Sequence, residues 1–347
     1  MIEKLTLADP GPGEVEVIVD ACAICHSDVS YADGFWGGDL PAVWGHEAVG
    51  RVTGVGVGVG LDIGQLVVVT LIRSCGECRH CLNGHFVTCT ASFRLDEVSP
   101  LTDATGAPVT HGLRTAAFAE AVVVHESQVV PIPADMSPVA ASLLACGVIT
   151  GVGAVRNTAK VEPGTTVVVI GCGGVGLNVV QGARLAGAEV IVAIDLEQPK
   201  LEVARSLGAT HVVDPARADA AAAVGEATQG HLADYVFVAV GSKAAVDSSY
   251  ALVGAMGALV MVGMPATGVL SEFEPGNLAG MNQRILGSKM GTSVIQRDIP
   301  ELTAEYQAGR LQLDSLVSAT FPLDGINEAM DQVRAGTALR NVIVFGS

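Results

Sequence analysis

The sequence predicts an α/β protein in which a doubly wound parallel sheet is joined to a second, mainly β domain. After Cys146, short apolar runs alternate with helical segments at the spacing of βαβ units. Before Cys146, short β segments are separated by glycine-rich turns and loops. The change of pattern predicts a parallel-sheet domain at residues 148–289 and a second domain that begins with residues 1–147.

The first part of the chain is expected to form strands at residues 15–19 and 66–70 and a helix that begins at Ser137. Residues 50–64 are rich in glycine and are expected to form turns between short strands. Residues 92–111 form a polar insertion with little helical pattern. The first domain is therefore predicted from short strands, not from long periodic segments.

The second domain is expected to contain buried strands, because each of its apolar runs is too short for a helix. The six runs cover residues 167–170, 190–194, 211–213, 235–239, 258–262 and 285–287. Helices are expected between them, including residues 177–186 and 216–227. The last part of the chain is expected to form helices at 297–307 and 324–335 and a strand at 341–345.

A glycine-rich turn follows the first of these strands. Gly171, Gly173 and Gly176 fit the pattern G-x-G-x-x-G, and Asp195 closes the next strand. The glycines let backbone amides approach a pyrophosphate, the helix N-terminus presents unpaired N–H groups, and the carboxylate accepts from a ribose hydroxyl. The alternative is a glycine-rich turn without function. The pattern favours a dinucleotide site, and the negative charge of Asp195 favours NAD over NADP. Its other loop residues are Gly174 and Val175.

Four cysteines lie within one short segment: Cys75, Cys78, Cys81 and Cys89. Four thiolates can surround a tetrahedral zinc ion and leave no place for water or substrate, as in structural zinc sites. An iron–sulfur cluster is the alternative, but the spacing matches neither ferredoxin pattern well. The segment therefore predicts a structural zinc site.

The composition excludes several classes of protein. A formal charge of -17 argues against nucleic-acid binding, because nothing resembles a basic stripe. No run approaches the roughly 18 apolar residues of a membrane span, and residues 1–20 lack the order of a signal peptide. We therefore expect a cytoplasmic protein without a membrane or nucleic-acid partner. An anionic cofactor also requires local cations.

Further motifs are ambiguous when each is taken alone, since Cys25, His46 and Cys146 could each be a packing residue. Taken together with the motifs above, they make the chain resemble the zinc-containing medium-chain alcohol dehydrogenases over essentially its full length. The additional matching motifs are Cys25-His26-Ser27-Asp28, Gly45-His46-Glu47 and Cys146-Gly147 followed by Thr150-Gly151.

The resemblance implies a Rossmann cofactor domain and a GroES-like catalytic domain that also includes residues 290–347. It implies a second, catalytic zinc held by Cys25, His46 and Cys146, with the fourth position open, a ligand set known for alcohol dehydrogenases. The roles implied for the neighbouring residues follow the same resemblance. Ser27 hydrogen-bonds the substrate oxygen and begins a proton relay, Asp28 orients His46, and Glu47 lies behind the metal.

The resemblance also supplies the missing cations. His26 and Arg340 match positions that meet the pyrophosphate, and Lys200 matches one that contacts the adenosine ribose. Taken alone, Lys200 and Arg340 would be interpreted as solvated surface charges. The remaining positions predicted to lie at the cofactor are Thr150, Val240, Val262 and Met264.

The implied substrate pocket is apolar apart from Ser27. It is lined by Trp36, Leu71, Leu113 and Phe118. A glutathione- or other thiol-dependent formaldehyde dehydrogenase is the alternative activity. That activity is disfavoured, because Trp36 stands where those enzymes place an acid and Phe93 where they place an arginine. In family members whose proton relay ends in a histidine, that histidine would stand at the position of Ser30. Proton release is therefore expected to end on water or another group.

The predicted activity is reversible hydride transfer between an apolar-tailed primary or secondary alcohol, aliphatic or aromatic, and NAD. The alternatives within the enzyme class are reduction of an aldehyde or ketone in the cell and the formaldehyde activity above. A non-catalytic binding or structural homologue is the alternative from another class. The family also implies a homodimer or homotetramer, with residues 258–262 as an edge strand that pairs between subunits.

Overall fold

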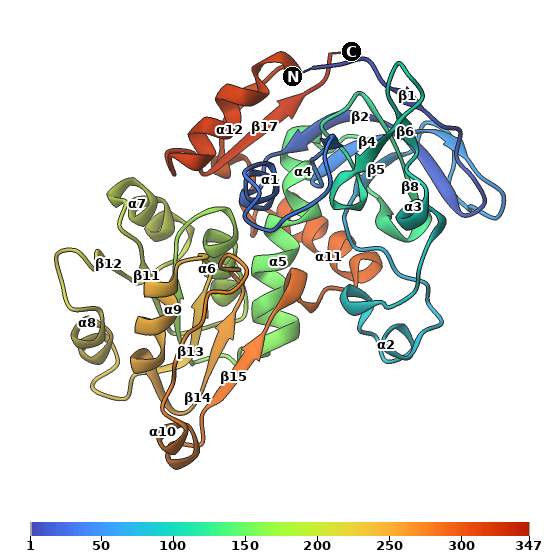
Figure 1. Ribbon diagram of the computed structural model, residues 1–347. Helices are drawn as coiled ribbons and strands as arrows, with labels where there is room; N and C mark the ends of the chain where they lie inside the picture. Colours follow the sequence, from blue (N-terminus) through green and yellow to red (C-terminus); the bar gives the residue numbers. More distant parts are fainter. Residues whose placement is uncertain (1, 347) are drawn as a thin grey trace. The chain divides into compact units, whose positions relative to one another are not determined.

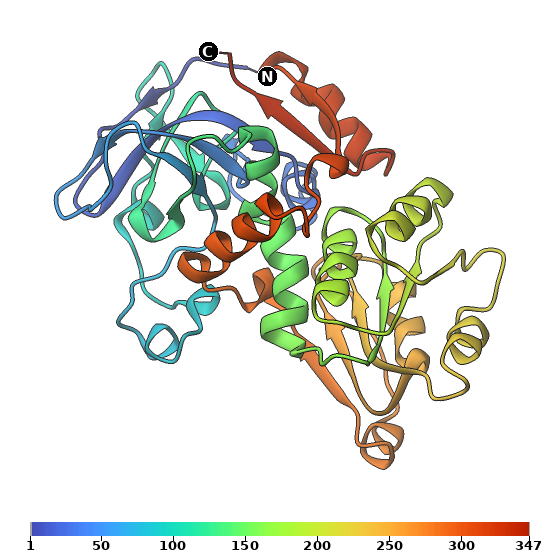
Figure 2. The same cartoon turned by 180° about the vertical axis from the view of Figure 1, so that it is seen from behind.

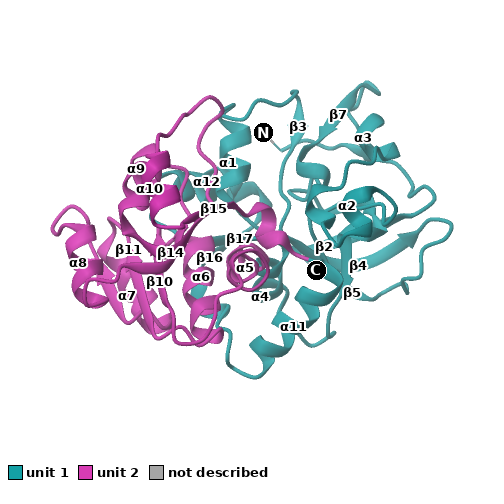
Figure 3. Ribbon diagram, turned by 90° about the horizontal axis from the view of Figure 1, so that it is seen from below, with its two compact units in different colours: residues 1–146, 294–347 teal, residues 147–293 magenta. Residues whose placement is uncertain are grey.

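The computed structural model describes residues 2–346 of the 347-residue chain. Two compact units are present (Figure 3): unit 1 runs to Cys146 and resumes at Val294, and unit 2 is Gly147–Ser293. Gly147 and residues 290–293 therefore belong to unit 2, although the sequence predicted them in the other domain. Each unit has its own sheet and its own apolar core.

Unit 2 is built on a parallel sheet of six strands in the order β12-β11-β10-β13-β14-β15. Chain order reverses between β10 and β13, which is the arrangement of a doubly wound fold. All six predicted strands are present, and the α/β fold class is confirmed. The strands are β10 Thr166–Ile170, β11 Val190–Ile194, β12 His211–Val213, β13 Ala233–Val238, β14 Val253–Met261 and β15 Arg284–Gly287.

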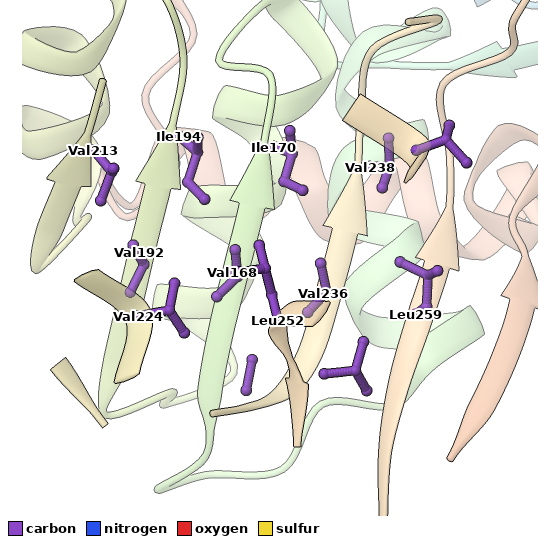
Figure 4. Packing of buried hydrophobic residues seen from close by; sticks show 13 residues of the cluster. Val168, Ile170, Val192, Ile194, Val213, Val224, Val236, Val238, Leu252 and Leu259 are labelled. Carbon is purple, nitrogen blue, oxygen red and sulfur yellow. The ribbon is translucent and has the colours of Figure 1, made fainter. Parts of the chain in front are cut away.

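Both faces of the central strands β10, β11 and β13 are buried, which explains why these strands are continuous apolar runs instead of alternating ones. Val168, Val192 and Val236 lie side by side on one face, next to Val224 of α8 and Leu252 (Figure 4). Helices lie on both faces (Figures 1 and 2). The helices of unit 2 are α5 Gly147–Gly153, α6 Gly174–Leu185, α7 Gln198–Leu207, α8 Ala220–Ala227, α9 Lys243–Ser249 and α10 Pro275–Gly280.

Unit 1 contains a sheet of seven strands, in which β16-β17-β2-β4-β5-β9 follow one another and β8 pairs with β2. The C-terminal strand β17 pairs antiparallel with β2 from the start of the chain (Figure 1). Valines at alternating positions of β2 form one side of the core with Val52, Val67 and Val122. The strands are β2 Glu14–Ala23, β4 Ala48–Val55, β5 Leu66–Val69, β8 Ala121–His125, β9 Val129–Pro131, β16 Val317–Phe321 and β17 Arg340–Val344.

A smaller sheet of unit 1 has the order β1-β6-β7-β3. The insertion at residues 92–111, predicted to be poor in helix, contributes β6, β7 and the four-residue helix α3 Arg94–Glu97. The strands are β1 Thr6–Leu7, β3 Ala42–Val43, β6 Leu101–Thr102 and β7 Pro108–His111. The other helices of unit 1 are α1 His26–Ala32, α2 Arg79–Leu82, α4 Pro138–Ser142, α11 Ile295–Gln307 and α12 Ile326–Arg334.

The structure differs from the sequence expectations at two strands. No strand is predicted between the helices at 297–307 and 324–335, but Val317–Phe321 pairs in parallel with β17 as β16. Residues 258–262 were expected at an edge, but β14 lies between β13 and β15, so the edge strand on this side of the sheet is β15. β15 is only four residues long and its side chains are mostly exposed, so the sequence does not indicate that it forms the edge of the sheet.

No single helix among the described residues has the length and hydropathy of a membrane span. Two consecutive helical segments, Pro138–Ala145 and Gly147–Ala159, reach those limits only when they are taken together, with a bend at the break.

Candidate metal centres and dinucleotide loop

A buried group of ligand-type side chains in unit 1 comes from three separate parts of the chain. Cys25 follows β2, His46 and Glu47 precede β4, and Cys146 follows the segment after α4. β2 and β4 are antiparallel partners with Cys22 opposite Ala48, so Cys25 and His46 lie at the same end of the sheet. One ligand atom from each of the four residues lies within 4.8 Å of the others. Predicted ligands that are far apart in sequence are thus brought together.

Asp28 holds two of these ligands through its carboxylate. Asp28 Oδ1 lies 3.0 Å from Nδ1 of His46 and accepts the backbone N–H of Gly45 at 3.0 Å. Asp28 Oδ2 accepts the N–H of Cys25 at 2.9 Å. The bond at Nδ1 leaves Nε2 of His46 as the atom that can face a metal. Nε2 is buried and has no hydrogen-bond partner among the described residues.

Glu47 lies beside the same group in an ion pair with Arg340. Arg340 is only 4% exposed, so its interpretation as a solvated surface charge is wrong. Burial raises the pKa of Glu47 to about 7, although the charge of Arg340 opposes this shift. The pair places a carboxylate beside the two cysteines, and the guanidinium of Arg340 balances its charge.

The two thiols of the group influence one another. The contact with Cys146 and the neighbouring His46 hold the pKa of Cys25 well below its ordinary value, against the effect of burial. The same contact, together with burial, raises the pKa of Cys146 well above its ordinary value. Without a cation, only one thiolate is favoured here. A bound divalent metal would deprotonate both thiols, so this donor set suits zinc.

The four-cysteine segment forms a second group of ligand atoms around α2. The Sγ atom of Cys75 lies 3.6 Å from that of Cys89 and 4.0 Å from that of Cys81, and Cys78 and Cys89 are 3.9 Å apart. Four sulfurs at ~2.3 Å from a tetrahedral zinc would be separated by ~3.8 Å. None of the four forms a disulfide. The residues therefore fit a closed tetrahedral zinc site.

The predicted dinucleotide loop connects β10 to α6 in unit 2. Gly171 has a φ of +91°, and a Cβ on Gly176 would lie 1.7 Å from the carbonyl oxygen of Gly171. Gly173 precedes the helix, and the space where its Cβ would stand is open for 4 Å. The first and third glycines are thus needed for the turn and its packing, and the second leaves the backbone open to a ligand. Gly174 and Val175 form the first turn of α6.

Asp195 lies just beyond the carboxyl end of β11, as predicted. Its carboxylate accepts the N–H of Cys172 at 2.6 Å and the N–H of Glu197 at 2.9 Å. These bonds fix the acid beside the glycine loop. Lys200 lies in the first turn of α7, which follows Asp195.

The other predicted cofactor residues of unit 2 lie near the carboxyl ends of its strands or on α5. Val240 follows β13, and a Cβ placed on Gly171 would lie 3.0 Å from the Cβ of Val240. Val262 follows β14, and Met264 is 62% exposed. The hydroxyl of Thr150 on α5 lies 3.7 Å from the sulfur of Met290. His26 and Arg340 belong to unit 1, where His26 is exposed.

The four predicted pocket residues and Ser27 are all partly buried in unit 1. Trp36 packs edge-on against Tyr31 with 5.4 Å between the ring centroids. Phe118 packs against two apolar clusters of unit 1. Leu113 has the left-handed φ of +52°. The Oγ atom of Ser27 lies 3.6 Å from the sulfur of Cys25, so this residue is beside the buried ligand group.

Sequence reasoning missed two buried polar residues, Arg73 and Gln128. Arg73 is 1% exposed and Gln128 is fully buried, and they hydrogen-bond one another. The only signal for Arg73 was a charged residue shortly after the apolar strand β5, at the end of the mainly apolar run of residues 66–72. Gln128 carried no signal, because polar residues between two strands are usually exposed.

Comparison with known proteins agrees with this arrangement. Residues 11–134 match the alcohol dehydrogenase GroES-like domain, and residues 174–308 match the zinc-binding dehydrogenase domain. Alcohol dehydrogenase class-3 from Myxine glutinosa is 35% identical over an alignment of 356 positions, gaps included, that spans 99% of this chain and 93% of that protein.

Two solved structures are similar over nearly the whole chain. An alcohol dehydrogenase zinc-binding domain protein from Burkholderia ambifaria has a TM-score of 0.95 and 33% identity, covering 100% of this chain and 95% of that one. Benzyl alcohol dehydrogenase from Acinetobacter calcoaceticus has a TM-score of 0.91 and 31% identity, covering 99% and 94%. The chain therefore belongs to the zinc-containing medium-chain alcohol dehydrogenase family.

Proposed function

We propose that this enzyme transfers hydride reversibly between NAD and an alcohol with an apolar tail, aliphatic or aromatic. The observation that carries the proposal is the buried group of Cys25, His46 and Cys146, whose ligand atoms lie within 4.8 Å of one another and of Glu47. A buried metal held by only three protein ligands keeps a position open for a substrate oxygen, as catalytic zinc sites do.

Two zinc ions per chain are proposed. Cys25, His46 and Cys146 would hold the catalytic ion, and the four cysteines at 75, 78, 81 and 89 would hold the structural ion. When bound, zinc would lower the pKa of the alcohol hydroxyl as a Lewis acid, and NAD would accept the hydride. Asp28 keeps Nδ1 of His46 occupied, and Glu47 with Arg340 sets the charge behind the ligands.

Ser27 is proposed to move the proton. Its hydroxyl is partly buried and lies 3.6 Å from the sulfur of Cys25, within reach of an oxygen held beside that ligand. The hydroxyl would accept the alcohol proton and pass it on toward solvent. Because Ser30 stands where a relay histidine would, proton release is proposed to end on water or another group.

The preference for NAD rests on Asp195. Two backbone N–H groups fix its carboxylate at the end of β11, beside the glycine loop that follows β10. A ribose 2′-hydroxyl can donate to this carboxylate, whereas a 2′-phosphate would bring a second negative charge close to it. His26, Lys200 and Arg340 are proposed as the cations for the rest of the dinucleotide.

An apolar-tailed alcohol is proposed as the substrate because the pocket residues Trp36, Leu71, Leu113 and Phe118 offer no charged group. The similarity to a benzyl alcohol dehydrogenase supports aromatic members of this class. The thiol-dependent formaldehyde activity is disfavoured further by the packing of Phe93. Its ring lies edge-on to His125 at 4.7 Å and beneath the guanidinium of Arg73 at 5.6 Å, so it has a structural role.

A homo-oligomer is also proposed, as a dimer or tetramer. β15 is one of the two edge strands of the six-stranded sheet, and its side chains are largely exposed. An exposed edge of this kind favours pairing with another copy of the same strand. Size-exclusion chromatography with light scattering would measure the state.

The experiment that tests the proposed function is a screen of ethanol, hexanol, cyclohexanol and benzyl alcohol with NAD and with NADP. We expect NADH formation and a higher kcat/KM with NAD than with NADP. Asp195→Asn should reduce that preference. Asp214→Asn, the same change at the end of the neighbouring strand β12, should leave it unchanged. Failure to reduce either cofactor with any alcohol would contradict the activity.

A further inference from the structure

A buried guanidinium belongs to Arg73, four residues after the end of β5. Its Nε donates to the side-chain oxygen of Gln128 at 2.7 Å, one terminal nitrogen donates to Asp96 at 3.0 Å, and the other donates to the carbonyl of Arg114 at 3.0 Å. Burial lowers the pKa of Arg73 to about 10, so the group stays charged near neutral pH. A charge is kept in this place because each of the three guanidinium nitrogens has an acceptor.

Gln128 reaches the same carbonyl oxygen. Its amide nitrogen donates to the carbonyl of Arg114 at 3.0 Å and to that of Thr70 at 2.8 Å. The Arg114 carbonyl therefore accepts two side-chain hydrogen bonds from groups that are almost completely buried. The two hydrogen bonds from Arg73 and Gln128 hold the backbone at Arg114 in place.

The backbone around Arg114 needs such support. Leu113, Arg114 and Ala116 have φ values of +52°, +64° and +52°, so three non-glycine residues out of four are left-handed. L-residues rarely adopt this conformation, because Cβ then approaches the carbonyl oxygen, and it persists only where the surroundings determine it. Residues 113–116 would relax if the two hydrogen bonds to Arg114 were lost.

The same segment supports the backbone next to the buried ligand group. The Thr115 hydroxyl donates to the carbonyl of Gly45 at 2.7 Å, and the N–H of Ala117 donates to the same oxygen at 3.0 Å. The N–H of Gly45 in turn donates to Asp28, the residue that orients His46. The carbonyl of Arg114 is thus linked to His46 by a short chain of contacts within unit 1.

We propose that Arg73 is a positioning residue for the alcohol site, which acts through the Arg114 carbonyl to hold the left-handed segment 113–116 in place. This inference rests on the proposed function, because it assigns Leu113 and Phe118 to the apolar wall of that site. Arg73 sets the position of this wall and so favours alcohols with large apolar tails over small ones. Lysine could not replace it fully, since an ammonium cannot reach three partners in fixed directions.

The test compares Arg73→Met with Arg94→Met. Arg94 is the matched control, because its guanidinium pairs with Glu14 and not with the Arg114 carbonyl. The measurement is kcat/KM for benzyl alcohol and for ethanol, with thermal unfolding and zinc content for each variant. In Arg73→Met, we expect the ratio of the two kcat/KM values to fall roughly tenfold, the size of effect that a loosened apolar pocket gives. The KM for NAD should change less than about twofold.

Arg73→Lys provides a second variant that retains the charge beside Asp96. It is expected to fold even if Arg73→Met does not, and to lose part of the preference for benzyl alcohol. An unchanged ratio in a folded Arg73 variant, even with a lower melting temperature, would overturn the inference and leave a structural role alone. An equal loss in Arg94→Met would also overturn it. A wild-type enzyme that oxidises no alcohol would instead contradict the proposed function.

Discussion

The two cysteine-containing groups of unit 1 both offer thiol ligands to a metal, but they lie in opposite settings. The four cysteines at 75, 78, 81 and 89 come from one local segment, and three of them are partly exposed. Cys25, His46 and Cys146 come from distant parts of the chain and are all buried. One group is therefore built by local chain geometry and the other by the packing of the sheet.

The support of the ligands differs in the same way. The Cys75 sulfur accepts the backbone N–H groups of Glu77 and Cys78 at 3.4 and 3.2 Å. In the buried group, the side chains of Asp28 and Arg340 hold or balance the ligands. A hydrogen bond from a backbone N–H is kept when the side chain of that residue is changed, whereas a bond made by a buried side chain is lost. The buried group should thus be the more sensitive of the two to mutations around its ligands.

The largest effect is expected from Cys146→Ala, which removes a ligand of the buried group. We expect kcat/KM for the best alcohol to fall by roughly a thousandfold or more, because the metal that lowers the pKa of the alcohol would be lost or displaced. Metal analysis should give one zinc ion per chain in place of two. The one that remains belongs to the four-cysteine segment.

Retention of activity in Cys146→Ala would remove the functional difference between the two groups. Cys172→Ala is the matched control, because Cys172 is equally buried but belongs to neither group. It should keep both zinc ions.

The next largest effect is expected from Cys81→Ser in the four-cysteine segment. Loss of the structural zinc should lower the free energy of unfolding by about 4 kcal/mol or more, since metal binding to a closed site contributes directly to folding. Thermal unfolding with zinc analysis is the measurement. The remaining folded enzyme should keep its buried zinc, and a variant with full stability and two zinc ions would contradict a structural role.

The difference between local and distant residues also explains how much could be predicted from the sequence. The parallel sheet of unit 2 and the four-cysteine group follow from local patterns, since strand length, glycine spacing and cysteine spacing are visible in single segments. The buried group required a family resemblance, because Cys25, His46 and Cys146 have no local relation to one another. Their proximity depends on the pairing of β2 with β4 and on the position of α4.

The elements that could not be predicted depend on tertiary context. β16 has an alternating pattern of only five residues, and its pairing with β17 decides its conformation. Arg73 is charged, yet it is buried because Gln128, Asp96 and the Arg114 carbonyl converge on it. The position of Arg340 behind Glu47 likewise results from a strand at the far end of the chain. No local pattern contains these partners.

A smaller effect is expected from Asp28→Asn, which tests the side-chain support of the buried group. An amide cannot accept from Gly45 and His46 at one end and from Cys25 at the other, since one end is now a donor. We expect zinc affinity and kcat/KM to fall by roughly 10- to 100-fold. Competition with a chelator gives the affinity.

Asp33→Asn is the control for this change, because Asp33 lies at the end of the same helix and pairs with Arg334. It should leave zinc affinity unchanged. Equal losses in the two variants would show that the effect comes from α1 as a whole and not from the orientation of His46.

The smallest effect is expected from Glu77→Ala, which tests the backbone support of the four-cysteine group. The Glu77 side chain is exposed, and the contact with Cys75 is made by its backbone N–H, which alanine also has. The free energy of unfolding should change by less than about 0.5 kcal/mol. Gly76→Val in the same loop is the contrasting variant, because Gly76 has a φ of +75° and a β-branched residue there would move that N–H. Loss of zinc in Glu77→Ala would mean that side chains, not the local backbone, hold this group together.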